Sequence, residues 1–510
     1  MVVRQRQINK NEGVKDDTTR NIQNFVTEQP MGILKKQRWC KRKYLRIIIV
    51  LCLLFLIYIG LANNTKTFQI SSKAIDNLAI HFNLHKPFYV IIIDAGSTAS
   101  RVVAFTFHMS IVNGQLILDD ELFFETKPGL SSFVKKPNQI EKSLNILLQK
   151  AKLKIPQQEW SRTPLYLRAT AGLRLLSNDE SQKILEECKK VLNMSGFYTS
   201  DDSVAIMEGS DEGIFSWFTV NFLLERFSKT SNNIDHATNT ISTFDLGGGS
   251  TQITFALTPN VIEKKAKELA IYKEKIFHIN AFDRNMSIFT ESFLGMGLMA
   301  ARKEILMHPD NHKNQTKKIN IASPNLEVIE IYAECINPII SGVEWTYDRK
   351  KYIVKGPING MHKIIKTQNF AGTDEVRPIV RFSTCLDIIK KVINANIPHD
   401  LSEFLEHDIY AFSYYFDRAT EAGLIDPFKG GIISIESIYK TARETCEYPN
   451  TEQPFMCLDL SFIYVLLHEG FGLDKKSNIF MQKKINGHEL SWALGAAFNI
   501  LQKDMKYLSQ

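Results

Sequence analysis

The chain has 510 residues, of which 44% are hydrophobic and 23% are charged, with 26 glycines and 16 prolines. These ordinary globular proportions exclude a disordered, collagen-like or disulfide-scaffold protein, and the length suggests two or three domains. The net charge is +7, but residues 1–46 hold twelve Lys/Arg against four Asp/Glu, a sum of +8, so all other residues sum to −1. The chain beyond residue 46 is therefore not basic, and its charge does not favour a nucleic-acid partner.

The basic excess of residues 1–46 stands directly before an uncharged apolar run, residues 47–62. A helix over this run spans roughly 24 Å, slightly short of a ~30 Å hydrocarbon core, and Tyr44 and Arg46 extend it by snorkelling. We predict a cytosolic basic tail (1–46), a single transmembrane signal anchor (47–62) and a lumenal stem (63–86), a type II arrangement. A buried core helix and a cleaved signal peptide are the alternatives.

Glycosylation sequons and cysteines agree with a lumenal body. The sequons all follow the apolar run, at Asn63, Asn193, Asn285 and Asn314. Five cysteines lie beyond the anchor region, and an oxidising compartment would allow two bridges among them. Local pairing favours Cys335–Cys385 and Cys446–Cys457 and leaves Cys188 free in a helical pattern, although the sequence permits other pairings.

From Pro87 onward, strand-like and helix-like segments alternate, which is typical of α/β architecture. The patterns predict strands at 88–93 and 101–107, helices at 139–153, 178–193 and 213–227, and a surface loop at 310–325.

One motif occurs twice. Asp94-Ala-Gly-Ser-Thr98 lies between two hydrophobic strands, and Asp245-Leu-Gly-Gly-Gly-Ser-Thr251 lies between strands at 240–244 and 252–257, 151 positions later. This repeat predicts two related lobes, each offering one loop to a shared cleft.

The repeated loops have the composition of a phosphate site. Glycines let backbone N–H groups converge on phosphate oxygens without interference from a Cβ atom. The carboxylates of Asp94 and Asp245 would repel phosphate unless a divalent metal lay between them, and oxygen ligands suit Mg²⁺ or Ca²⁺. Neighbouring hydroxyls add donors, namely those of Ser97, Thr98, Ser250 and Thr251.

Other nucleotide and metal motifs are missing from the sequence, including the P-loop, His-Glu-x-x-His and zinc-type cysteine spacings. A hydrolase needs a base for water, and Asp211 and Glu212 lie near the start of a predicted helix, which stabilises a carboxylate. The same pattern is also usual for any helix start. Thr170 and Arg174 follow a strand and face phosphate in one interpretation, whereas Arg174 is a helix-surface residue in the other.

Taken together, these segments resemble the apyrase family, the ecto-nucleoside triphosphate diphosphohydrolases. Further stretches, such as Ser292-Phe-Leu-Gly-Met-Gly-Leu298 and Cys457-Leu-Asp-Leu-Ser461, resemble its soluble-type, secretory-pathway branch (types 5 and 6). The five characteristic regions of the family are matched in order by Asp94–Thr98, Ala169–Leu176, Gly209–Gly213 with Trp217, Asp245–Gln252 and Ser491–Ala496.

The resemblance implies an α/β, two-lobed actin/Hsp70/sugar-kinase-like (ribonuclease H-like) fold with nucleotide in the interlobe cleft. Lobe I is expected at 87–240 and lobe II at 241–480, with a C-terminal segment, 481–510, that returns to lobe I.

The resemblance also implies roles for individual residues. Glu212 matches the catalytic base, Thr170 and Gln252 match residues near the attacking water, and Asp94 and Asp245 match the carboxylates that hold Mg²⁺ or Ca²⁺ through water. Trp217 matches a family tryptophan, with core packing as the alternative. Phosphate or nucleotide contacts are implied for Gly96, Ser97, Thr98, Arg101, Gly247, Gly248, Gly249, Ser250, Thr251, Tyr414, Tyr415 and Phe416, without a choice of the ring that stacks on the base.

The function implied is hydrolysis of the terminal phosphate of UDP, GDP and IDP, more weakly of ADP and triphosphates, in the Golgi or endoplasmic reticulum lumen. Such an enzyme would be a monomer with a functional link to glycosyltransferases. A broad ecto-apyrase acting on ATP and ADP, an exopolyphosphatase-like enzyme on the same fold, and a catalytically silent nucleotide-binding protein are the alternatives. The sequence leaves open the choice of metal, the ranking of diphosphates and the release of a soluble form by cleavage in the stem.

Overall fold

The computed structural model describes residues 44, 46–55, 58, 75–76, 79, 82, 86–112, 114–227, 236–281, 284–312, 318–319, 328–365, 374–397, 400–448 and 450–508. The chain divides into two units, Met1–Lys73 and Ala74–Gln510. In the first unit, residues 46–55 are helical and exposed. No helix within the described part of the chain has the length and hydropathy of a membrane span. Residues 56–57 and 59–62 of the predicted anchor, like Asn63 and Asn314, lie outside the described residues.

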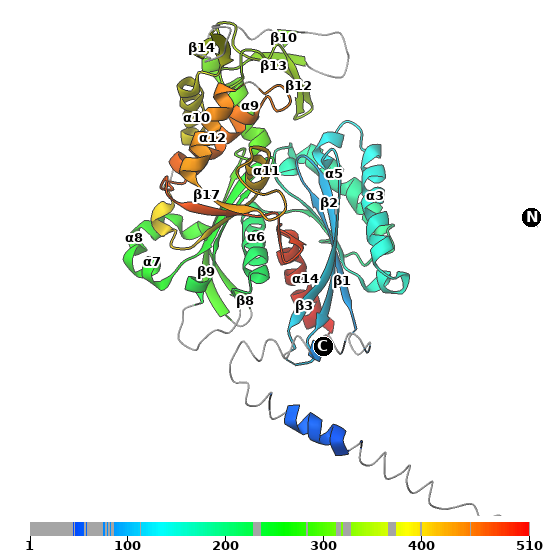
Figure 1. Cartoon of the computed structure of the whole chain (residues 1–510). Coiled ribbons are helices and arrows are strands. Elements are labelled where there is room, and N and C mark those ends of the chain that lie inside the picture. The colour runs from blue at the N-terminus through cyan, green and yellow to red at the C-terminus, as the bar shows by residue number, and fades with distance from the viewer. Residues whose placement is uncertain are drawn as a thin grey trace, which may run out of the picture. The chain divides into compact units, whose positions relative to one another are not determined.

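The second unit contains two large sheets, each with helices against it (Figure 1). The first sheet has five strands in the order β3-β2-β1-β4-β5, in which β1 pairs antiparallel with β2 and parallel with β4. Its strands are β1 (Phe88–Ala95), β2 (Ser100–Met109), β3 (Leu116–Thr126), β4 (Leu165–Ala169) and β5 (Val204–Ile206), and the helices that follow them are α3 (Asn138–Lys154), α4 (Ala171–Arg174), α5 (Asn178–Asn193) and α6 (Gly209–Leu223).

Strand β1 is buried on both faces, which explains its uninterrupted apolar sequence. Ile91 and Ile93 pack in one cluster with residues of α3 and α5. Val90 and Ile92 pack in another with residues of α6 and of the C-terminal helix α14 (Ala493–Leu508). The last helix of the chain therefore returns to the first sheet.

The second sheet has seven strands in the order β17-β18-β16-β6-β7-β9-β8. It repeats the centre of the first, because β6 pairs antiparallel with β7 and parallel with β16. Its strands are β6 (Ser242–Leu246), β7 (Ser250–Ala256), β8 (Ile276–Ala281), β9 (Arg284–Leu294), β16 (Ile409–Ser413), β17 (Gly431–Ser434) and β18 (Asn478–Met481). The helices of this half are α7 (Pro259–Lys264), α8 (Ala266–Leu269), α9 (Leu298–Met307), α10 (Phe382–Asn396), α11 (Tyr414–Glu421), α12 (Ile435–Glu447) and α13 (Met456–Val465).

Smaller sheets complete the molecule, and the one at residues 484–489 contacts the first sheet, where the Glu489 N–H donates to Glu121 Oε1 at 2.7 Å. The described strands of these sheets are β10 (Lys318–Ile319), β11 (Val328–Tyr332), β12 (Val343–Tyr347), β13 (Lys350–Lys355), β14 (Met361–Ile365), β15 (Glu375–Ile379), β19 (Lys484–Ile485) and β20 (His488–Glu489). Short 3₁₀ helices span Leu130–Phe133, Gln157–Arg162, Ala237–Asn239, Ala270–Lys275, Pro309–His312 and Ser402–Phe404, and a π-helix spans Leu466–Gly470.

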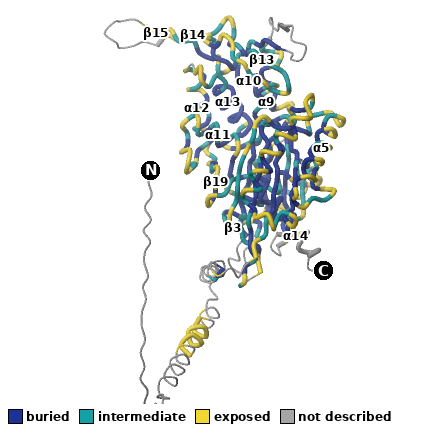
Figure 2. Tube along the Cα trace, turned by 90° about the vertical axis from the view of Figure 1, so that its right-hand side faces the viewer, coloured by how far each residue is buried: buried dark blue, intermediate teal, exposed yellow. Residues whose placement is uncertain are grey.

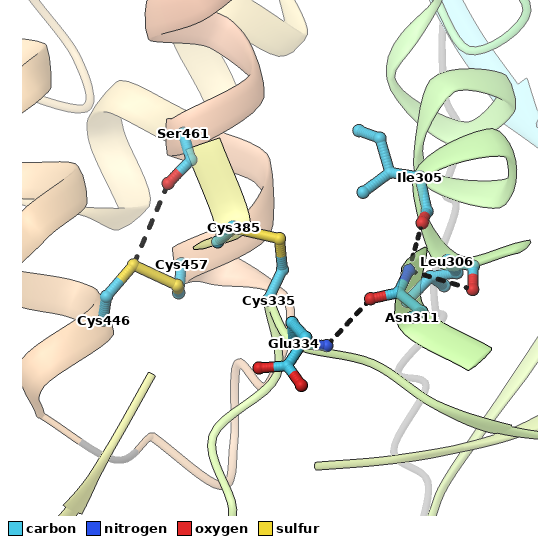
Figure 3. Close-up of a disulfide and its surroundings, with 9 residues drawn as sticks. All are labelled: Ile305, Leu306, Asn311, Glu334, Cys335, Cys385, Cys446, Cys457 and Ser461. Atoms are coloured by element: carbon cyan, nitrogen blue, oxygen red, sulfur yellow. Dashed lines mark hydrogen bonds between the residues drawn. A yellow bond between two sulfur atoms is a disulfide. The ribbon is translucent and has the colours of Figure 1, made fainter. Parts of the chain in front are cut away.

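Both predicted disulfides are present in this half of the molecule (Figure 3). Cys335 follows β11 and bonds to Cys385 of α10. Cys446 of α12 bonds to Cys457 of α13. Cys188 is unbonded and fully buried in α5, and burial raises the pKa of its thiol to about 12, so this cysteine is unreactive.

Helices α6 and α14 pack on each other between the two sheets (Figure 1). The backbone of Gly495 in α14 comes so close to Phe215 that a Cβ atom would lie 2.4 Å from the Phe215 carbonyl oxygen. The Gly495 N–H also donates to Thr219 Oγ1 at 3.0 Å. This close contact connects the C-terminus to the helix on which Glu212 lies.

Most predicted elements lie where the sequence places them, and burial follows the sheets (Figure 2). The helix predicted at 213–227 is an exception, because α6 begins four residues earlier and ends before Glu225, which has a φ of +57°. The stem predicted at 63–86 is not wholly separate from the globular unit, since buried Asp76 accepts hydrogen bonds from Ser110 Oγ and the Ile111 N–H. Most of the predicted loop at 310–325 lies outside the described residues.

Candidate active site

The two repeated loops line one cavity of about 630 Å³. In each hairpin the aspartate at the end of the first strand has a partner seven residues later on the second strand, Arg101 opposite Asp94 and Gln252 opposite Asp245. Equivalent positions of the two hairpins therefore lie beside the same cavity. The predicted residues that line this cavity are Asp94, Gly96, Ser97, Thr98, Arg101, Thr170, Glu212, Asp245, Gly247, Gly248, Gly249, Ser250, Tyr414 and Phe416.

The second loop turns its backbone N–H groups away from α9. The N–H groups of Leu298 and Met299 donate to the carbonyl oxygens of Gly247 and Gly248 at 2.9 and 3.0 Å. Across a trans peptide the next N–H points opposite to the carbonyl, so the Gly248 and Gly249 N–H groups point away from α9. Both glycines line the cavity, where these donors suit phosphate oxygens.

The two loops approach each other closely at Gly248. A Cβ atom on Gly248 would lie 2.4 Å from Ser97 Oγ and 2.9 Å from Thr98 Cγ2. Such distances are shorter than any van der Waals contact, so a side chain at Gly248 would displace the side chains of Ser97 and Thr98 from their positions in the cavity.

Asp94 and Asp245 are both buried, and each has an oxygen, Oδ1, with no hydrogen-bond partner among the described residues. The other oxygens are held: Arg101 Nη1 donates to Asp94 Oδ2 at 3.0 Å and Ser216 Oγ donates to Asp245 Oδ2 at 3.4 Å. Burial raises the pKa of Asp94, against the opposing charge of Arg101. Burial also raises the pKa of Asp245 to about 6, although the polar side chain of Ser413 nearby opposes the increase.

These two carboxylates fit a cation held through water. In the described part of the chain, no group of three or more His, Cys, Asp or Glu side chains is arranged to bind a metal directly. Two unpartnered carboxylate oxygens in one cavity suit a hydrated divalent ion, because Mg²⁺ retains several waters and accepts oxygen ligands. Such an ion would also remove the cost of burying both charges.

Glu212 lies in the first turn of α6, with 7% of its surface exposed. Its carboxylate accepts hydrogen bonds from Arg174 Nη2 and, at 3.2 Å, from Gln252 Nε2. Burial raises the pKa of Glu212 to about 8; Arg174 opposes this increase, whereas Asp245 and Asp94 add to it. A divalent cation is the largest charge in such a site and would lower this pKa, which favours the proton-accepting form.

Gln252 connects the base to the second loop. Its Nε2 also donates to Ser250 Oγ at 2.8 Å and to Ser292 Oγ at 3.0 Å. Its Oε1 is buried and has no hydrogen-bond partner in the described part of the chain. An acceptor beside a carboxylate is suited to orienting a water molecule.

Three predicted site residues do not line the cavity, namely Gln252, Thr251 and Tyr415. Thr251 is fully buried, and its hydroxyl donates to the Asp245 carbonyl oxygen at 2.8 Å. Tyr415 is fully buried, because it lies on the face of α11 that packs against the hydrophobic core of the second sheet. Neither side chain therefore faces the cavity in which the other predicted contact residues lie. Trp217 is also fully buried and packs against Phe227, which supports core packing.

Three further residues make contacts in the site. The sequence predicts no role in the site for Ser216 or Ser292, and it suggests a phosphate contact or a surface position for Arg174. Arg174 pairs with Glu212 and does not line the cavity. Ser216 lies four residues after Glu212 on α6, a spacing that places both on one helix face and could have identified it. Ser292 has no local signal, because it meets Gln252 only through the pairing of β7 with β9.

Comparisons with known proteins identify the family and the fold class of the chain. Residues 83–508 match the GDA1/CD39 (nucleoside phosphatase) family. The chain is 36% identical over 420 residues to ectonucleoside triphosphate diphosphohydrolase 5 of Bos taurus, which covers 81% of this chain and 88% of that protein. It is 34% identical over 430 residues to nucleoside-diphosphatase uda-1 of Caenorhabditis elegans, covering 81% of each.

Ectonucleoside triphosphate diphosphohydrolase 6 of Mus musculus is 35% identical over 424 residues, 82% of each chain. Among solved structures, nucleoside triphosphate hydrolases from Neospora caninum align with a TM-score of 0.52 and 15% identity, covering 86% of this chain and 96% of that chain. This alignment confirms the predicted two-lobed α/β fold class.

Proposed function

Because the chain belongs to the GDA1/CD39 (nucleoside phosphatase) family, we propose that it hydrolyses the terminal phosphate of nucleoside diphosphates, UDP, GDP and IDP ahead of ADP and triphosphates. Two relatives have names that specify this substrate class, uda-1 and the human nucleoside diphosphate phosphatase ENTPD5, which is 36% identical over 417 residues. The observation that carries the proposal is the placement of Glu212 and two aspartates around one cavity between two glycine loops, with Gln252 hydrogen-bonded to Glu212.

The cofactor proposed is Mg²⁺ or Ca²⁺, held by Asp94 and Asp245 through water. When bound, such a cation neutralises charge on the phosphate oxygens. The N–H groups of the glycine loops and the hydroxyls of Ser97, Thr98 and Ser250 grip the remaining oxygens.

Glu212 and Gln252 act on the water. Gln252 Oε1 accepts one hydrogen bond from water and Glu212 takes the other proton as the water oxygen attacks the terminal phosphorus in line. A bond forms from the water oxygen to phosphorus and the bridging P–O bond breaks. The products are inorganic phosphate and a nucleoside monophosphate. Arg174 lowers the pKa of Glu212 and so opposes the effect of its burial.

We place the catalytic unit in the Golgi or endoplasmic reticulum lumen, behind a single N-terminal anchor. The two disulfides support an oxidising compartment, and Asn193 and Asn285 are exposed, as glycosylation requires. Removal of UDP or GDP would there relieve product inhibition of glycosyltransferases.

The test is phosphate release by the full-length protein from UDP, GDP, IDP, ADP, UTP and ATP, with Mg²⁺, Ca²⁺ or a chelator. We expect metal-dependent hydrolysis of UDP and GDP that Glu212→Gln lowers by about 10²–10⁴-fold. Glu208→Gln is the matched control, because Glu208 is exposed one turn earlier and its side chain makes no capping hydrogen bond. A preference for ATP would favour the ecto-apyrase alternative, and binding without turnover would favour a silent nucleotide-binding protein.

A further inference from the structure

The wall of the cavity formed by α11 carries side chains that phosphate hydrolysis does not use. Ser413, at the start of this helix, lines the cavity beside the glycine loops, and the rings of Tyr414 and Phe416 follow it. Asp417 and Arg418 line the same cavity one turn further on. At 1.5 Å per residue, Asp417 lies about 6 Å along the helix axis from Ser413. Aromatic rings beside polar groups at this distance from a phosphate site suit a nucleobase.

Asp417 offers an acceptor that the protein does not use. Its side chain is half-buried, and it receives charge interactions but no hydrogen bond from the described residues. Burial raises the pKa of Asp417, while Lys483 and Arg418 lower it. An ionised carboxylate only accepts hydrogen bonds, so a ligand at this position must supply an N–H or O–H group.

Arg418 offers donors from a guanidinium held in place. Its nitrogens contact Glu421 at 2.8 and 2.9 Å and Asp459 at 3.5 Å. Asp459 is fully buried and is itself fixed by Arg302, which donates to it at 3.0 and 2.5 Å and stacks on Phe455 at 4.3 Å. A guanidinium has five N–H donors, so these contacts do not exhaust Arg418. The cavity wall thus holds an acceptor, Asp417, and a donor, Arg418, on consecutive residues.

We propose that Asp417 and Arg418 read the hydrogen-bonding edge of the nucleobase, with Asp417 accepting from a ring N–H and Arg418 donating to the adjacent carbonyl oxygen. Uracil, guanine and hypoxanthine share this lactam edge. Adenine and cytosine present an unprotonated ring nitrogen beside an amino group, which opposes both side chains. The inference rests on the proposed function and explains, from one acceptor and one donor, why UDP, GDP and IDP share a preference. Asp459 acts as a positioning residue for Arg418.

The experiment compares kcat/KM of the full-length protein and of Asp417→Asn for UDP, GDP, IDP, CDP and ADP. Replacing the charged acceptor with a neutral amide, one end of which donates, should lower kcat/KM about 10–100-fold for the three lactam nucleotides, chiefly through KM. The values for CDP and ADP should stay within about threefold or rise, because an asparagine amide can donate to their ring nitrogen. Asp387→Asn is the control, since Asp387 is exposed on α10 and loses the same charge outside the cavity.

Arg418→Lys should have the same base-dependent effect with a smaller loss, because lysine keeps the charge and loses the fork of donors. Binding of UMP and CMP measured by calorimetry provides a readout without catalysis, and we expect Asp417→Asn to weaken UMP only. A uniform loss over all five nucleotides, or unchanged selectivity, would overturn the inference while the diphosphatase activity stands. If the wild-type protein hydrolyses no diphosphate, the proposed function fails. Recognition of the nucleobase by Asp417 and Arg418 is then tested by binding alone, and equal binding of UMP and CMP would overturn it.

Discussion

Arg174 provides a test of how the site sets the basicity of its catalytic carboxylate. Its guanidinium donates to Glu212, and the two side chains are only 13% and 10% exposed. Burial raises the pKa of Glu212 to about 8 even though Arg174 opposes the increase. Replacing Arg174 with glutamine removes the opposing charge, so the pKa of Glu212 must rise further and the proton-accepting form must become scarcer at neutral pH.

The size of the effect follows from the contact. An opposite charge at hydrogen-bond distance changes a carboxyl pKa by about one to three units. In Arg174→Gln, the acid limb of the kcat/KM profile for UDP should therefore move to higher pH by about one to three units, at a fixed saturating concentration of divalent cation. At pH values below both limbs, activity should fall about 10–1000-fold, and the deficit should shrink as the pH rises.

The assay is phosphate release between pH 5.5 and 10, and Arg162→Gln is the control because Arg162 is exposed and pairs with Glu159. A profile that is lowered equally at every pH, without a shift of its acid limb, would refute the electrostatic role and leave Arg174 as a packing or positioning residue. An unchanged profile would refute the role of the Arg174–Glu212 pair altogether.

Two further changes test the loops and the disulfides. Gly248→Ala should lower kcat/KM for UDP at least about tenfold, because its Cβ would lie 2.4 Å from Ser97 Oγ, whereas Gly247→Ala, whose nearest contact is 3.1 Å, should cost less; equal losses would contradict the close approach of the loops. Removing the Cys335–Cys385 disulfide, which closes 50 residues, should lower the free energy of unfolding by about 4 kcal/mol, against about 3 kcal/mol for Cys446–Cys457, which closes 11. Denaturant titration of the two double-serine variants measures this order, and a reversed order would be inconsistent with the loop-length argument.

Local sequence identified the elements that repeat and the groups that carry charge. The two aspartate–glycine hairpins stood out because strand periodicity changes abruptly to glycine and hydroxyl residues at Asp94 and Asp245. The hairpins depend on neighbours along the chain, so no tertiary information was required. The separation of the cysteines only favoured the two disulfides, and the structure decided between the possible pairings. The end of α6 was misplaced because a positive φ at Glu225 has no clear signal in that sequence.

The sequence by itself determined which residue types are available for the chemistry: glycines and hydroxyls for phosphate, carboxylates for a cation and for a base. The tertiary structure decided which of them meet. Thr251 and Tyr415 are adjacent to cavity residues in sequence but point into the core, because successive side chains on a strand or helix face different directions. Arg174 reaches Glu212 across 38 positions, and Ser292 reaches Gln252 across 40. Such contacts arise from the packing of elements distant in the chain, which residue spacing along the sequence does not encode.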